Sequence, residues 1–232
     1  MSYDSAAHRN AYMAFHGRRA DFLMQCIASL GLGTDATVLD VGRSPLTNLV
    51  LARFPRLTTL GLPLDDTLLD KADQLDSTRV PHIVFDLNAA STASAWVVPA
   101  QFDLILFNEV VEHLRIAPTW VFRYLHALMR PGAFLVLQTP NAVSLGHRVQ
   151  MLVGKNPYVE FALDAETGSH HFREYTRSEL LGHAERAGLT LFEHRFVNYF
   201  PARSALLRAV STLTTAVPSF RNGQTFVFQR PG

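Results

Sequence analysis

Five short apolar runs alternate with helical patterns along the first 140 residues, and this alternation restricts the fold more than any other feature. Each run is rich in β-branched or aromatic residues, which is typical of strands buried on both faces. The runs are Thr37–Val41, Leu57–Leu62, His82–Asp86, Phe102–Phe107 and Phe134–Gln138. The clearest helical pattern between them is Ala117–Met129, with its apolar residues on one face. Strands that alternate with helices predict a parallel sheet covered by helices on both faces.

Segments outside these runs continue the pattern. Apolar residues at helical spacing predict a helix over Phe22–Leu30. Thr176 and Glu179 form a capping box that opens a helix ending at Gly188. Two more strands and an apolar helical stripe follow, at Leu189–Val197, Thr225–Gln229 and Leu206–Val217 respectively.

The alternation is interrupted between Asn141 and Tyr175. This stretch holds a short helical piece at Leu145–Val153 and then a polar segment that contains histidines. We expect it to form a cap over one end of the sheet.

Composition excludes several classes of protein. Lysine and arginine total 21 against 20 acidic residues, so the broad positive field of a nucleic-acid-binding protein is missing. No apolar run approaches the roughly 18 residues needed to span a bilayer. The single cysteine, Cys26, excludes an internal disulfide framework and indicates a reducing compartment. A cytoplasmic protein with a small-molecule partner is predicted.

Candidate functional residues follow the strands, because ligands of open parallel sheets bind outside the carboxyl ends of the strands. Asp40 and Gly42 stand at the end of the first run, and Asp86 ends the third. Asn108 to Leu114 follow the fourth run, and supply carboxylate, amide and imidazole groups.

At these positions the chain resembles the class I S-adenosylmethionine-dependent methyltransferases, over about residues 36–229. Val38–Thr47 is similar to the family's glycine-rich first motif, and Phe102–Leu114 to its fourth. The resemblance implies an α/β, doubly wound, Rossmann-like sheet of seven strands, the last antiparallel, with S-adenosylmethionine as cofactor. It also implies the cofactor-binding residues, which are Asp40, Gly42, Ser44, Asp86, Leu87, Asn108 and Glu109. Asp86 would accept a hydrogen bond from the adenine amino group, and Leu87 would pack beside the base.

Two departures from the family pattern concern cofactor binding. Ser44 and Leu46 occupy places where the family usually has glycine, so the methionine end would meet a bulkier loop. Pro63 stands where the family has an acid for the ribose, with Asp65 and Asp66 shortly after it. A dinucleotide-binding protein would need the same missing glycines and also a phosphate site, so that alternative fits less well.

Glu109, Glu112 and His113 are spaced i, i+3 and i+4, which places them on one face if the chain is helical there. The spacing resembles the metal-binding Glu-x-x-Glu-His of ubiquinone-pathway and small-RNA O-methyltransferases. The alternative is that Glu112 and His113 hold the loop and line the pocket without a metal. We expect activity to be independent of a divalent metal, since this set supplies only three ligands.

The cap contributes His170 and His171, and a neutral imidazole could take a proton from an acceptor hydroxyl. The alternative is that one of them only hydrogen-bonds the cap to the sheet. We expect His171 and Tyr175 to reach over the pocket and Arg173 to anchor the segment to an acid. His171 is the first candidate for the catalytic base, and His113 is the next.

The resemblance implies methyl transfer to an oxygen, or less favourably a nitrogen, of a small metabolite or sugar-containing acceptor. Leu152–Tyr158 and His171–Tyr175 are similar to a bacterial subgroup often encoded with glycan-modifying enzymes, which favours a glycan or lipid-linked acceptor. The alternative is a degenerate member of the fold that acts as a binding or partner subunit without catalysis. The apolar C-terminal stripe could form a homodimer face or a membrane-surface contact, with internal packing as the default interpretation.

One domain is expected over residues 1–232. Its parts are a cofactor-binding core at 34–140, a cap for the acceptor at 141–176, and a C-terminal part of the core at 177–232.

Overall fold

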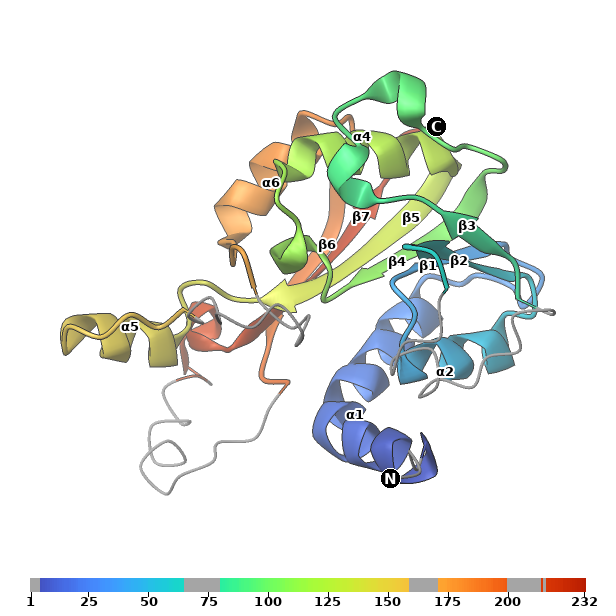
Figure 1. Ribbon diagram of the computed structural model, residues 1–232. Coiled ribbons are helices and arrows are strands. Elements are labelled where there is room, and N and C mark those ends of the chain that lie inside the picture. Colours follow the sequence, from blue (N-terminus) through green and yellow to red (C-terminus); the bar gives the residue numbers. More distant parts are fainter. Residues whose placement is uncertain (1–4, 65–79, 159–170, 200–213, 215) are drawn as a thin grey trace.

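The computed structural model describes residues 5–64, 80–158, 171–199, 214 and 216–232; for 5–13 and 15 it describes the backbone only. A seven-stranded sheet runs through the molecule in the order β3-β2-β1-β4-β5-β7-β6 (Figure 1). The strands are β1 (Val38–Val41), β2 (Leu57–Gly61), β3 (His82–Val84), β4 (Phe102–Asn108), β5 (Met129–Pro140), β6 (Thr190–Val197) and β7 (Gly223–Gln229). The first five pair in parallel, whereas β7 is antiparallel to both β5 and β6. The predicted doubly wound sheet with an antiparallel last strand is confirmed.

The helices lie on both faces of this sheet (Figure 1). They are α1 (Ser5–Ser29), α2 (Pro45–Arg53), α4 (Pro118–Leu128), α5 (Leu145–Leu152) and α6 (Arg177–Glu185). Short 3₁₀ turns are η1 (Leu87–Ala89), η2 (Ala93–Ala95), η3 (Val111–His113) and η5 (Pro218–Phe220).

Two apolar cores result, one on each face of the sheet. Leu23 and Ile27 of α1 and Val50 of α2 pack with one side of β1 and β4. Phe122 and Leu125 of α4 pack on the other side. All four residues of β1 are buried, as expected of a central strand.

Several predicted boundaries differ from the structure. The first helix begins at Ser5 rather than near Phe22, and β5 extends from Met129 to Pro140. Helix α2 was not among the predicted elements. Most of the predicted stripe Leu206–Val217 lies outside the described residues, so the homodimer hypothesis stays a prediction. None of the helices in the described part of the chain is long and apolar enough to cross a membrane.

The two described portions of the predicted cap are joined to each other and to the sheet. Asn141 forms a parallel bridge with Tyr175, whose carbonyl oxygen accepts hydrogen bonds from Ala142 N and from Gln224 of β7. The backbone of Phe172 and Arg173 donates to the Glu112 carbonyl oxygen, at 2.7 and 3.2 Å. The segment after residue 170 is therefore hydrogen-bonded to η3, the turn that follows β4.

Candidate functional site

A cavity of about 140 Å³ opens at the carboxyl ends of β1 and β4, where the strand order reverses. This is the position at which open α/β sheets bind ligands. The lining residues come from α1, the loop between β1 and α2, and the segment after β4. They are Arg19, Leu23, Asp40, Gly42, Arg43, Ser44, Leu46, Val50, Asn108, Glu109 and Val110. Five predicted cofactor residues thus share one cavity: Asp40, Gly42, Ser44, Asn108 and Glu109.

The loop after β1 is held in place by the start of α2. Ser44 is the N-cap, and its side chain accepts from Leu46 N while Thr47 Oγ1 accepts from Ser44 N at 3.0 Å. Thr47 Oγ1 also donates to Asp40 Oδ2 at 2.7 Å, and both residues are buried. The Ser44 side chain therefore ties the loop to α2 through a hydrogen bond that a glycine could not make.

Gly42 is required by its backbone and by the space around it. Its φ is +80°, a conformation that favours glycine, and an added Cβ would lie 3.0 Å from Val110 Cγ2. The wall of the cavity is thus open at this point because a side chain is missing.

Glu109 has a positive φ of 54°, which is uncommon for a residue other than glycine. Its Oε2 lies 3.1 Å from Arg19 Nη1, and the two side chains are 18% and 4% exposed. Burial raises the pKa of Glu109, and the positive charge of Arg19 opposes that rise. Among the described residues, Glu109 Oε1 and Asn108 Oδ1 are buried with no hydrogen-bond partner. Backbone strain and unsatisfied polar atoms in one cavity are typical of a binding site.

Arg19 is the residue that sequence analysis missed. A single arginine inside a long helix has no local feature that marks it as functional. By contrast, the Ser44–Pro45–Leu46–Thr47 capping box is a local pattern, and could have predicted α2.

Asp86 and Leu87 are placed apart from this cavity. The Asp86 carboxylate caps η1 and accepts from Asn88 N and Nδ2, at 2.9 and 3.0 Å, while Asp86 itself is exposed. Leu87 is 5% exposed and belongs to the core. Their adenine contacts stay predictions, and Asp65 and Asp66 lie outside the described residues.

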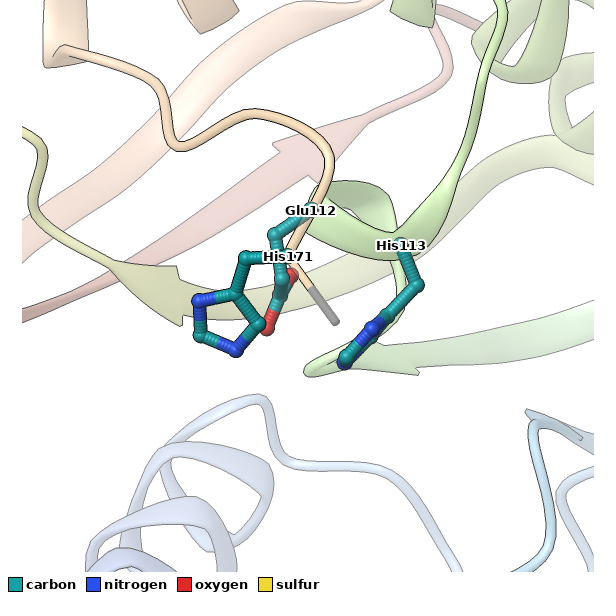
Figure 2. A group of neighbouring side chains, drawn as sticks. All are labelled: Glu112, His113 and His171. Carbon is teal, nitrogen blue, oxygen red and sulfur yellow. The ribbon is translucent and has the colours of Figure 1, made fainter. Parts of the chain in front are cut away.

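The predicted grouping of Glu109, Glu112 and His113 is wrong, because the chain forms the 3₁₀ turn η3 rather than an α-helix and Glu109 turns toward Arg19. Glu112 and His113 instead meet His171 from the cap (Figure 2). These three residues offer ligand atoms that all lie within 4.8 Å of one another, an arrangement that could hold a divalent cation. The His113 and His171 rings are 5.0 Å apart, centroid to centroid.

Glu112 is the buried member of this group. Its Oε2 accepts from Thr139 Oγ1 at 3.0 Å, and within the described chain Oε1 has no hydrogen-bond partner. Burial raises the pKa of Glu112 well above its usual range, and the charge of Glu109 raises it further. Both effects disfavour the charged form of Glu112 relative to a glutamate in water.

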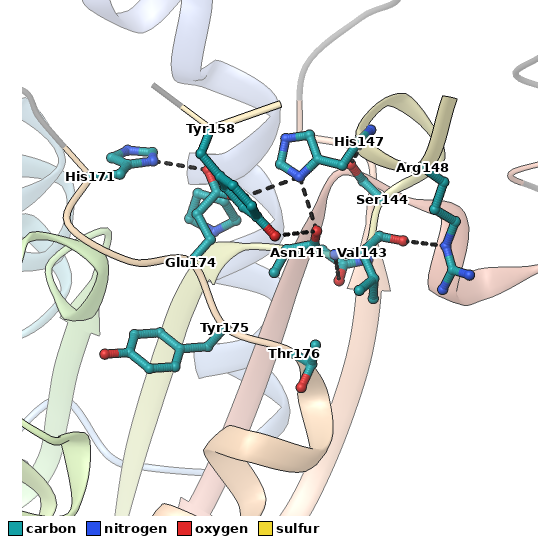
Figure 3. Close-up of polar contacts among 12 residues, drawn as sticks. Asn141, Val143, Ser144, His147, Arg148, Tyr158, His171, Glu174, Tyr175 and Thr176 are labelled. Atoms are coloured by element: carbon teal, nitrogen blue, oxygen red, sulfur yellow. Dashed lines mark hydrogen bonds and ion pairs between the residues drawn. The ribbon is translucent and has the colours of Figure 1, made fainter. Parts of the chain in front are cut away.

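Glu174 orients His171 and lies near His147 (Figure 3). Its Oε1 lies 3.0 Å from His171 Nδ1, and its Oε2 lies 3.6 Å from Nδ1 of His147 in α5. Because Nδ1 of His171 faces this carboxylate, Nε2 is the ring nitrogen left to contact a ligand. The side chain of His171 is 25% exposed, so it is accessible to a ligand.

The remaining cap predictions have different outcomes. Arg173 does anchor the segment to an acid, since its Nη2 lies 2.6 Å from Glu179 Oε1 in the first turn of α6. The prediction for Tyr175 is wrong: this side chain is 3% exposed and packs in the core beneath the cap, because a large ring is stabilised more by burial than by an open edge. His170 lies outside the described residues.

Comparison with known proteins adds to this geometry. A family model described as a methyltransferase domain matches residues 15–194. Trans-aconitate 2-methyltransferase of Rhizobium meliloti is 34% identical over 104 residues, which are 44% of this chain and 37% of that protein. The protein of the same name from Methylobacterium nodulans is 29% identical over 171 residues, 71% of this chain and 63% of its own length. The chain therefore aligns with less than two thirds of either relative.

Solved structures share the fold at low identity. An S-adenosylmethionine-dependent methyltransferase from Clostridium acetobutylicum superposes with a TM-score of 0.61 at 11% identity, covering 94% of this chain and 92% of that one. The N-methyltransferase NodS from Bradyrhizobium japonicum superposes with a TM-score of 0.55 at 15% identity, covering 92% and 95%.

Proposed function

The chain belongs to the methyltransferase domain family. On that premise we propose that it transfers a methyl group from S-adenosylmethionine to an oxygen of a small metabolite or sugar-containing acceptor in the cytoplasm. The predicted membership of the class I methyltransferases, and with it the cofactor, is confirmed. The acceptor and the site residues are the parts that this proposal adds.

The observation that carries the proposal is the cavity between Arg19, Gly42 and Glu109. It presents a positive group, a buried carboxylate oxygen that has no partner in the described chain, and a wall opened by a missing side chain. A ligand end that carries both an ammonium and a carboxylate complements this set, because Glu109 Oε1 accepts and Arg19 donates. The methionine end of the cofactor has these two groups.

The bound cofactor supplies a methyl group already activated on a sulfonium sulfur, which passes in line to the acceptor. The chain's own residues then have to align the acceptor and exclude water. The backbone contacts of Phe172 and Arg173 to Glu112 hold the cap close enough for both tasks.

His171 is the proposed proton acceptor, with His113 beside it. Nδ1 of His171 donates to Glu174, so Nε2 carries the lone pair that can take the hydroxyl proton of the acceptor. Glu174 would stabilise the imidazolium that forms.

The names of similar proteins bear on the size of the acceptor and on the acceptor atom. The two relatives are named for a small acceptor, trans-aconitate, which favours a small molecule. NodS is named as an N-methyltransferase, which keeps nitrogen as the less favoured acceptor atom. In this proposal residues 34–140 bind the cofactor, 141–176 the acceptor, and 177–232 complete the sheet.

The test has two stages. Calorimetry with S-adenosylhomocysteine should show binding to the wild-type chain and strongly reduced binding to Gly42→Leu, because a side chain at φ +80° next to Val110 is strained. Tritium from the methyl group of S-adenosylmethionine should then appear in an oxygen-methylated small metabolite or sugar-containing acceptor. If the wild-type chain binds neither S-adenosylmethionine nor S-adenosylhomocysteine, the proposed methyl transfer is wrong and the alternative of a non-catalytic binding subunit is favoured.

A further inference from the structure

Helix α5 stands out from the body of the molecule at the end of β5 (Figure 1). All eight of its residues, Leu145–Leu152, are exposed or half-buried. Helices shorter than about 12 residues are marginal in water unless an apolar face is packed. Such a face on α5 is open to solvent.

The tip of α5 concentrates apolar side chains. Val149, Met151, Leu152 and Val153 are 48%, 47%, 85% and 65% exposed, so four large apolar residues within five positions face solvent. Scattered single apolar residues on a surface are ordinary, but a contiguous group marks a contact surface.

Within the described residues 141–158, the only full charges are positive, since this stretch contains no aspartate or glutamate. Arg148 and Lys155 are exposed and lie at i−4 and i+3 relative to Leu152. Arg148 Nε donates to the Val143 carbonyl oxygen at 2.7 Å, so this cation is held near the base of the helix. Apolar side chains flanked by cations complement an anionic lipid surface, where the cations meet headgroups and the apolar groups enter the acyl boundary. A second copy of the chain would present the same cations and repel.

The base of α5 is joined to the proposed acceptor site. His147, in its first turn, lies 3.6 Å from Glu174, which in turn holds His171 (Figure 3). A helix of eight residues is about 12 Å long, so the tip of α5 lies roughly that far from the base of the helix, where His147 faces Glu174.

We propose that the tip of α5, Val149–Val153 with Arg148 and Lys155, docks on an anionic phospholipid surface and presents the site to a lipid-linked acceptor. The part that concerns the acceptor rests on the proposed function. The docking itself requires only the exposed apolar side chains and the two cations.

Vesicle sedimentation of the full chain tests this. Vesicles that contain phosphatidylglycerol should bind it, vesicles of phosphatidylcholine alone should bind it weakly, and added salt should release it. Leu152→Glu should lower binding by about tenfold or more, since a charge replaces an apolar group at the lipid boundary. Val84→Glu is the matched control: Val84 is 52% exposed on β3, at the other end of the sheet order, and this variant should bind like wild type.

The outcomes separate the hypotheses. Equal vesicle binding by Leu152→Glu and wild type, with unchanged thermal melting, overturns the inference, as does no binding of wild type to anionic vesicles. A wild-type dimer that Leu152→Glu dissociates, without vesicle binding, would assign the surface to a second copy instead. Binding of S-adenosylhomocysteine is measured without vesicles, so failure of docking leaves the proposed function intact.

Discussion

Replacement of Arg19 by Met should weaken binding of the cofactor's amino-acid end while leaving its nucleoside end unaffected. Arg19 is 4% exposed in its side chain, and Nη1 lies 3.1 Å from Glu109 Oε2. The hydrogen bond that Arg19 would donate to the carboxylate of the ligand is charge-assisted, and such a bond typically contributes about 1.5 to 3 kcal/mol. We therefore expect S-adenosylhomocysteine to bind about 1.5 to 3 kcal/mol more weakly, or about 10- to 150-fold.

Calorimetry with two ligands distinguishes this from general damage to the fold. S-adenosylhomocysteine carries the ammonium and carboxylate, whereas 5′-methylthioadenosine lacks both. The affinity for 5′-methylthioadenosine should be unchanged in Arg19→Met. Arg18→Met is the control, because Arg18 is the neighbouring residue on α1 and is exposed. If both ligands lose affinity equally, or if S-adenosylhomocysteine binds Arg19→Met as tightly as wild type, the assignment of Arg19 to this end of the cofactor is wrong.

Four further predictions address the rest of the site and the sheet. Asp86→Ala should weaken S-adenosylhomocysteine binding by about 1.5 to 3 kcal/mol, the usual contribution of a hydrogen bond to a charged group; unchanged affinity in titration removes Asp86 from the site. His171→Ala should lower kcat about 100-fold with cofactor affinity unchanged, as for loss of a general base, and full turnover would transfer that role to His113. Turnover should persist after treatment with a chelator; loss that magnesium or zinc restores would make Glu112, His113 and His171 metal ligands. Burial lowers the pKa of His194 to about 4 from 6.5, so its native neutral form should lose stability as the pH falls from about 6.5 toward 4; His194→Phe should reduce that slope in acid-unfolding curves, and an identical slope would exclude His194 as its source.

The sequence by itself determined the sheet. Strands such as Val38–Val41 and Phe102–Asn108 are buried on both faces. A strand buried in this way needs consecutive apolar residues, and such a run can be recognised in the sequence. Helix α4 ends one residue before Met129, close to the predicted boundary, because its one-sided apolar pattern is also local. Gly42 was likewise identified from its place after the first strand, and its φ of +80° explains why glycine stands there.

The site depended on contacts between distant segments. Arg19 meets Glu109 only because α1 crosses the end of β4, and neither the helix pattern nor the spacing of residues near Glu109 contains that information. The i, i+3, i+4 spacing predicted one face for Glu109, Glu112 and His113. Because of the positive φ at Glu109 and the 3₁₀ turn after it, Glu109 pairs with Arg19, whereas Glu112 and His113 lie beside His171.

The cap shows the same division. His171 was a candidate from sequence, but its neighbours Glu112 and His113 were brought to it by backbone hydrogen bonds from Phe172 and Arg173 to Glu112. The spacing of apolar residues along a helix or strand shows which of its sides is buried, because side chains on one side recur at a fixed interval in the sequence. Which loops meet at the edge of the sheet is decided by strand order and by long-range hydrogen bonds, and only the tertiary structure contains these.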